Sequence, residues 1–111
     1  MSIVELIDKF HLQILSNLHD PEKEVTGGYT GDLLSDVIAN SKEGNVWITM
    51  QTHINIIAVA KLKELSAIII VMNRQVDKDA LDKANEEKIL VLRTDLPAYR
   101  ISGKFYEYGI K

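Results

Sequence analysis

The sequence predicts an α/β fold: a three-layer sandwich whose mostly parallel sheet of about four to five strands is covered by helices on both faces. Three observations lead to this prediction. Segments with strand-like patterns alternate along the chain with segments of helical periodicity. Residues 67–72 (AIIIVM) and 89–92 (ILVL) are apolar throughout, which is typical of strands buried on both faces of a covered sheet. Capping residues precede several of the helical segments.

The N-terminal segment is expected to be a helix over residues 3–10. Its apolar residues recur at i, i+3, i+4 and i+7, and Ser2 and Glu5 have capping-box spacing. Residues 12–15 alternate weakly between apolar and polar, which predicts a short strand. Residues 19–24 are polar and include a proline, so they are expected to form a surface loop.

The middle of the chain predicts a helix, a strand and a second helix. Asp32 is expected to be the N-cap of the first helix, which Gly44 would terminate. Its buried residues would be Leu33, Leu34, Val37 and Ile38. Residues 46–51 alternate as a strand, and Thr52 is expected to cap a helix from about residue 53 to residue 65.

Two further helices are predicted around the last strand. Asp77 is expected to cap a helix that turns Leu81 and Ala84 inward, and this helix leads into the apolar strand at residues 89–92. The final helix begins near Pro97, because proline is tolerated in a first turn, and ends before Gly109. Its inward stripe is Ile101, Phe105 and Tyr108.

The helix after Thr52 is unusually apolar, with almost no polar residue before Lys61. This composition is typical of a helix that is buried all round. One side would lie on the sheet, and the other would be covered either by the first helix or by a second copy of the chain. The apolar residues concerned are Ile54, Ile56, Ile57, Ala58, Val59 and Ala60.

Composition excludes several classes of protein. The 111 residues include 16 acidic and 13 basic side chains, and no segment concentrates lysine and arginine, so nucleic acid is not an expected partner. Without cysteine there is no disulfide and no thiolate metal site. No apolar run approaches the roughly 20 residues that span a bilayer, and residues 1–10 lack a signal-peptide pattern, so we expect one domain over residues 1–111, located in the cytoplasm.

Polar residues follow three of the predicted strands. Gln51, Thr52, His53 and Asn55 follow the first, Asn73 and Arg74 the second, and Arg93, Thr94 and Asp95 the third; Arg74 or Arg93 could add a bidentate contact to an anion. If these strands are parallel neighbours, their carboxyl ends meet at one rim, where helix N-termini offer free backbone N–H groups to an anion. The alternative is that these residues only cap helices, satisfy loop backbone or face solvent.

The segment from Thr26 to Asp32 holds three of the six glycines, including Gly27 and Gly28. Such a density suggests positive φ angles or a close approach of the backbone to another group. The segment is therefore either a turn or a loop that contacts a ligand. It matches neither of the common phosphate-binding glycine motifs.

The three histidines, His11, His19 and His53, are scattered and have no metal-ligand spacing, so we expect neither a metal site nor a cofactor. His53 lies at the predicted rim, where its side chain suits ligand contact or acid–base chemistry. Catalysis also requires a nucleophile and a group that orients the histidine, and the sequence identifies neither. We therefore predict no catalytic residue.

Three segments together resemble a DRTGG domain in their order and spacing: TGG at residues 26–28, GDLLS at 31–35 and ITMQTHIN at 48–55. The resemblance covers nearly the whole chain. It implies an α/β fold similar to the N-terminal domain of HPr kinase/phosphorylase, without the kinase active site, and an accessory regulatory role of the kind played beside CBS pairs and phosphotransacetylase-like enzymes. The chain departs from the family pattern at residues 23–25, which are KEV in place of the Asp-Arg pair.

We therefore predict a non-catalytic, homodimeric regulatory module that binds a small anionic or nucleotide-like metabolite. One alternative is a protein-interaction subunit that docks a partner enzyme or ATPase through the apolar helix. A more distant alternative is a small hydrolase or transferase that uses His53. The candidate ligand-binding residues are Thr26, Gly27, Gly28, Gln51, Thr52, His53, Asn55, Asn73, Arg74 and Thr94.

Overall fold

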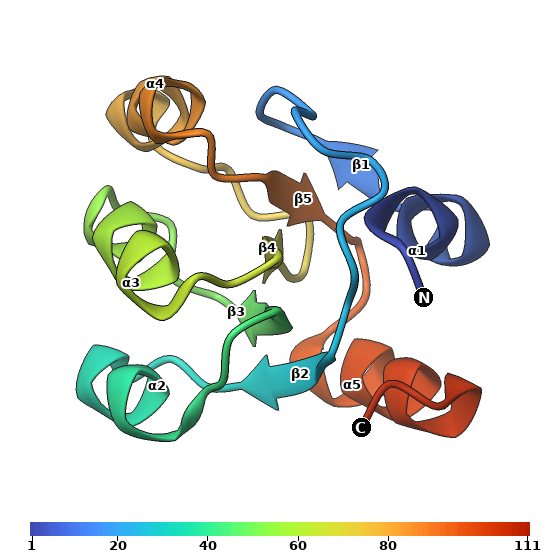
Figure 1. The fold of residues 1–111 in the computed structure, drawn as a ribbon. Helices are drawn as coiled ribbons and strands as arrows, with labels where there is room; N and C mark the ends of the chain where they lie inside the picture. The colour runs from blue at the N-terminus through green and yellow to red at the C-terminus, as the bar shows by residue number, and fades with distance from the viewer.

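The computed structural model describes all 111 residues and contains a single five-stranded sheet with helices on both faces (Figure 1). The order of strands across the sheet is β1-β5-β4-β3-β2. Strands β2 to β5 pair in parallel, and β1 runs antiparallel beside β5. The predicted three-layer sandwich is confirmed. The strands are β1 Gln13–Ile14, β2 Gly27–Thr30, β3 Asn45–Thr49, β4 Ala67–Ile70 and β5 Val91–Arg93.

The five helices divide between the two faces of the sheet (Figure 1). Helices α2, α3 and α4 cover one face, and α1 and α5 cover the other, where both chain termini also lie (Figure 1). None of these helices has the length and apolar character needed to cross a membrane. Their bounds are α1 Ile3–Phe10, α2 Leu34–Asn40, α3 Asn55–Lys63, α4 Lys78–Glu87 and α5 Ala98–Tyr108.

Each face of the sheet has its own apolar core. The strands contribute alternate residues to the two cores, since successive side chains of a strand point to opposite faces. In β4, Ile69 lies in the core under α1 and α5, while Ile68 and Ile70 lie in the core under α2, α3 and α4. Trp47 belongs to the second core, and its indole N–H donates a 2.8 Å hydrogen bond to the carbonyl of Gly31. All four residues of β4 are buried, as the apolar run predicts.

Helix α1 forms where the sequence places it. The backbone N–H of Glu5 donates to the Ser2 hydroxyl at 3.3 Å, so Ser2 caps the helix as its spacing predicts. The helix ends at His11, which adopts a left-handed conformation with φ of 53°. The short strand predicted at residues 12–15 is confirmed as β1.

The prediction for α2 was wrong at both ends. Leu33, not Asp32, occupies the N-cap position, and the helix ends at Asn40, before Ser41 instead of Gly44. Leu33 is 67% exposed and Ile38 is 38% exposed, so neither belongs to the core. The cause is that the Asp32 carboxylate bonds to the end of β3, which moves the helix start along the chain.

The glycine-rich segment is an edge strand, β2, and not a turn. None of Gly27, Gly28 and Gly31 has a positive φ; among the glycines, only Gly44 and Gly109 do. The expected close approach does exist at Gly27. A Cβ there would lie 3.2 Å from the Asn45 amide nitrogen and 3.2 Å from the backbone of Lys111. Gly27 therefore lets the C-terminal residue and β3 approach the strand.

Helix α3 begins later than predicted and is not buried all round. Thr52 does not cap it, because the helix starts at Asn55 and the N-cap position is Ile54, without a side-chain cap bond. Ile54 is 42% exposed and Leu62 is 66% exposed. The first helix does not cover α3, since α1 lies on the opposite face of the sheet (Figure 1). Instead, α3 lies between α2 and α4.

One buried hydroxyl joins the segment after β1 to the last strand. The Ser16 hydroxyl donates to the carbonyl of Ile89 at 2.8 Å and accepts from the N–H of Val91 at 2.7 Å. Ser16 is only 5% exposed, so water cannot readily replace either partner. This hydroxyl therefore joins the segment after β1 to β5 and to the residues just before β5.

We expect Ser16→Ala to lower the free energy of unfolding by about 1–3 kcal/mol, because it leaves a buried N–H and a buried carbonyl without a partner. Urea denaturation measures this change. Ser35→Ala is the matched control: Ser35 is exposed on α2, and its loss should change stability by no more than about 0.5 kcal/mol. Equal effects of the two changes would contradict this account of Ser16.

Candidate functional site

The carboxyl ends of β3, β4 and β5 lie side by side, as the candidate site requires. Thr49 pairs with Ile70, and Ile70 pairs with Arg93, in two neighbouring parallel ladders. Beyond β4 the chain turns sharply, with Met72 and Asn73 in left-handed conformations at φ of 58° and 52°. In this turn the N–H of Asn73 donates to the carbonyl of Thr94 at 2.9 Å, which ties the ends of β4 and β5 together. We call this edge of the sheet the rim.

Asp32 fastens the end of β3 from the neighbouring loop. Its carboxylate accepts hydrogen bonds from the Thr49 hydroxyl and from the N–H of Met50, both at 2.8 Å. Its carbonyl accepts a 2.9 Å bond from the side-chain amide of Gln51. Gln51 is therefore held against the loop before α2, and Asp32 is a rim residue that the sequence prediction assigned to a helix cap.

His53 and Asp77 form a second link across the rim. The His53 Nδ1 atom lies 2.7 Å from a carboxylate oxygen of Asp77, and the two side chains are 69% and 45% exposed. The N–H of Asp77 also donates to the carbonyl of Thr52 at 3.1 Å. The start of α3 is thereby joined to the start of α4. Asp77 is the orienting carboxylate for His53 that the sequence did not identify.

The two rim arginines differ in what they contact. Arg93 bonds twice to the side-chain oxygen of Gln13, at 2.8 and 3.1 Å, and once to the carbonyl of Arg74 at 3.1 Å. These bonds fasten β1 and the turn after β4 to β5, so the guanidinium of Arg93 is committed to the fold. Arg74 is exposed, and its side chain forms no hydrogen bond or ion pair within the chain.

Free backbone donors cluster immediately before α3. The N–H groups of Thr52, His53 and Ile54 make no hydrogen bond within the chain. Ile54 is the N-cap residue of α3, and Thr52 and His53 lie in the turn just before it, close to the helix end where the aligned peptide dipoles leave a partial positive charge. Together with Arg74, these groups give the rim donors suited to an anion.

The structure brings together only part of the predicted set. Six of the ten candidates lie at the rim: Gln51, Thr52, His53, Asn73, Arg74 and Thr94. Asn55 lines a groove of about 300 Å³ between α3 and α4. Thr26, Gly27 and Gly28 lie at the amino end of β2 and line a separate polar hollow of about 370 Å³ with Lys42 and Lys111. The glycine segment and the rim are thus at opposite ends of the sheet.

Besides Gln51 and His53, two more of the predicted residues are engaged within the fold. The Thr26 hydroxyl donates to the carbonyl of Glu43 at 2.8 Å and accepts a 3.3 Å bond from the Asn45 amide. Thr94 is 6% exposed, and its hydroxyl accepts from the N–H of Leu96 at 3.2 Å. Each of these two hydroxyls therefore holds a loop in place.

Comparisons with known proteins identify the fold. No protein-family model matches the chain, and neither does any curated protein. Among solved structures, the chain is similar to the CBS and DRTGG domains of the regulatory region of Clostridium perfringens pyrophosphatase, complexed with its activator diadenosine tetraphosphate. The TM-score is 0.70 at 16% sequence identity, and the match covers 92% of this chain and 44% of that one. The fold is therefore DRTGG-like, as the resemblance implies, and the chain spans less than half of the regulatory region that it matches.

We expect Asp32→Ala to lower the free energy of unfolding by about 1 kcal/mol, because the Thr49 hydroxyl and the Met50 N–H lose a charged acceptor. Chemical denaturation monitored by the fluorescence of Trp47 measures the change. Asp8→Ala is the control, since Asp8 is an exposed carboxylate on α1 that makes no hydrogen bond. If Asp32→Ala proved as neutral as the control, the carboxylate would not hold the end of β3.

The groove beside the rim contains a small ion-pair network. Glu87 at the end of α4 pairs with Lys61 of α3 and, at 3.4 Å, with Lys83. The hydrogen bond from Lys61, with that from Lys83, holds the pKa of the Glu87 carboxyl below its usual range. The pair with Lys61 joins α3 to α4 across the groove.

We expect the melting temperature of Glu87→Gln to fall below that of the unchanged protein at neutral pH. A carboxyl whose pKa is lowered by folding stabilises the fold above its unfolded pKa, about 4.3, and loses this contribution as the pH falls through the lower folded value. The two melting temperatures should therefore converge in acid. Glu86→Gln is the control, because Glu86 is 68% exposed and contacts only Lys83, at 3.6 Å. A difference independent of pH would contradict the assignment.

Proposed function

We propose that the chain is a non-catalytic regulatory module that senses a small anionic or nucleotide-like metabolite at the rim. The observation that carries this proposal is the group of free N–H donors at Thr52, His53 and Ile54 after β3, with the unpaired Arg74 in the loop that follows the neighbouring strand β4. All of these donors lie beyond the carboxyl ends of parallel strands, where ligands of open α/β sheets gather.

The chemistry of these donors favours phosphate or carboxylate. The N-terminus of α3 stabilises a nearby negative charge by about 0.3–1 kcal/mol, and an arginine can add a bidentate contact to the oxygens of a carboxylate or a phosphate. His53 and Asn73 supply further polar atoms at the same edge. The Gln51 amide holds the loop after β3 to Asp32, and the Thr94 carbonyl, which accepts from the N–H of Asn73, holds the loop that carries Arg74. His53, Asn73 and Arg74 are exposed, whereas Thr52 and Thr94 are buried, so a ligand would contact mainly the first three side chains.

The likeness to a pyrophosphatase regulatory region supports a regulatory role. That region is described in complex with diadenosine tetraphosphate, an activator with four phosphates and two nucleosides. A nucleotide-like ligand for this chain would place its phosphates at the start of α3. Such a module would act in the cytoplasm, beside a partner enzyme.

The exposed apolar residues of α3 favour a second candidate function, docking of a partner protein. Ile54 is 42% exposed and Leu62 is 66% exposed on the outer surface of this helix. A partner enzyme or ATPase seated there would cover the groove between α3 and α4. The His53–Asp77 pair keeps a hydrolase or transferase as a third and more distant candidate, because it supplies an oriented base without an identified nucleophile.

A thermal-shift screen with nucleotides and phosphorylated metabolites tests the proposal. A ligand that binds only the native state stabilises it by about 2.7 kcal/mol at a hundredfold excess over its dissociation constant. We expect at least one compound to raise the melting temperature. If none does, the regulatory-ligand proposal fails and docking through α3 is favoured.

Two substitutions locate the binding site. Arg74→Ala should reduce the ligand-induced shift without changing the melting temperature of the free protein, because the exposed Arg74 side chain forms no hydrogen bond or ion pair within the chain. Lys42→Ala is the matched control, since Lys42 lines the hollow at the other end of the sheet with Thr26, Gly27 and Gly28. If the ligand-induced rise in melting temperature were lost in Lys42→Ala and kept in Arg74→Ala, the ligand would bind in that hollow, and the proposed site at the rim would be wrong.

A further inference from the structure

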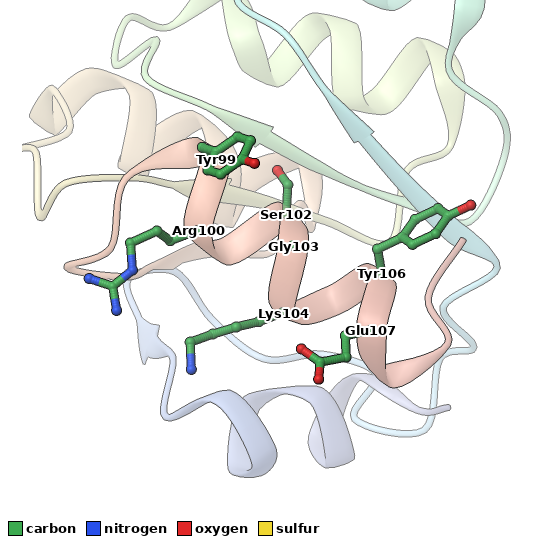
Figure 2. Close-up of a pocket in the computed structure, with 7 residues that line it drawn as sticks. All are labelled: Tyr99, Arg100, Ser102, Gly103, Lys104, Tyr106 and Glu107. Atoms are coloured by element: carbon green, nitrogen blue, oxygen red, sulfur yellow. The ribbon is translucent and has the colours of Figure 1, made fainter.

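The outer face of α5 carries two exposed aromatic side chains, Tyr99 and Tyr106, and only the Lys111 ammonium, 5.1 Å from the centre of the Tyr106 ring, lies over either of them. Tyr99 is 91% exposed and Tyr106 is 61% exposed, and a shallow hollow of about 760 Å³ lies over the helix between them (Figure 2). The inner face, by contrast, is packed, with Ile101 and Phe105 buried in the core. Large aromatic side chains exposed together on one helix face are typical of surfaces at which proteins associate.

Gly103 lies between these two tyrosines along α5. Glycine inside a helix costs about 1 kcal/mol relative to alanine. Nothing within the chain requires glycine here, since an added Cβ would meet no other heavy atom within 4 Å. Alanine would fit the fold at this position, and the missing side chain leaves room for a second helix to approach the backbone of α5 closely.

The residues around Gly103 are arranged almost symmetrically. Tyr99 precedes Gly103 by four residues and Tyr106 follows it by three, while Arg100 precedes it by three and Glu107 follows it by four. Figure 2 shows Arg100 and Glu107 projecting to the same side of the helix, and Tyr99 and Ser102 to the other. Neither Arg100 nor Glu107 forms an ion pair within the chain.

We infer that α5 docks on the α5 of a second copy of this chain, antiparallel, with the two helices crossing at Gly103. A two-fold axis through this crossing reverses the helix direction but keeps each flank on its own side. Arg100 then faces Glu107 of the second copy, and Glu107 faces Arg100, so one surface is complementary to itself. Tyr99 of each copy packs along Tyr106 of the other over the two glycines.

The contact is small, so the dimer is weak. The eleven residues of α5 span about 16 Å. One face of so short a helix buries less than the roughly 800 Å² per partner of a standard interface. The adjoining edge of β2 enlarges the surface, because the Thr30 hydroxyl lies 2.7 Å from that of Ser102. Lys104 lies further round the helix than Glu107 and stays in solvent. The dimer differs from the one predicted through the apolar helix, which is α3, on the opposite face of the sheet.

Sedimentation of the full chain from about 1 µM to about 1 mM tests the inference. We expect reversible dimerisation. Gly103→Lys places two lysines against each other at the crossing and should weaken the dimer at least about tenfold, while the melting temperature of the monomer does not fall. Ser35→Lys, which adds the same charge on exposed α2, should leave the dimer unchanged.

A charge swap tests the register. Arg100→Glu and Glu107→Arg should each weaken the dimer about fivefold or more, because each change places like charges opposite one another in two symmetric contacts. The double variant R100E/E107R should restore the affinity of the unchanged protein. A monomer at every concentration, a dimer indifferent to Gly103→Lys, or a double variant as weak as the single ones would overturn the inference. None of these outcomes depends on ligand binding at the rim.

Discussion

The parallel pairing of β3, β4 and β5 is the constraint on which the rest of the molecule depends. Parallel neighbours cannot be joined by a hairpin, so each pair needs a crossover helix, and such crossovers are right-handed. The chain moves across the sheet in one direction from β2 to β5. Three right-handed crossovers in the same direction place α2, α3 and α4 on the same face, and the other face is left to α1 and α5 (Figure 1). The buried isoleucines of β4 make this pairing favourable, because the strand contacts both cores.

The same pairing produces the rim and explains why its polar residues have two different tasks. Three loops leave the sheet at one edge, and their backbone groups must find partners there. Asp32 satisfies the end of β3, Arg93 holds the turn after β4, and Asp77 joins α4 to the loop before α3. The donors left over are those that no loop residue reaches, at Thr52 to Ile54 and on Arg74. The proposed ligand thus completes a hydrogen-bonding arrangement that the fold itself leaves open.

Local signals predicted the parts of the fold that local forces decide. The cap of α1 and the apolar runs of β4 and β5 need no distant partner to be recognised. The cap is confirmed, while β4 ends at Ile70 instead of residue 72, and β5 covers Val91–Arg93 instead of residues 89–92. The errors concern contacts between distant segments. Asp32 looks like a helix cap until β3 brings Thr49 beside it, 17 residues along the chain. Gly27 and Gly28 are residues of a type depleted in strands, and pairing with β3 makes them part of one. The same distance hid the partner of His53, which lies 24 residues away behind a helix and a strand.

Strand β2 lies at the edge of the sheet and packs against α5. As the last strand of the sheet it presents one unpaired side, and edge strands are sites where another chain can add. Helix α5 packs against β2 and β3, so its outer face borders that open edge. A second copy seated on α5 would stand beside β2 and limit access to it, at the opposite face of the sheet from α3 and its groove. Dimerisation and partner docking would then use separate surfaces, and both would leave the carboxyl ends of the strands open to a ligand.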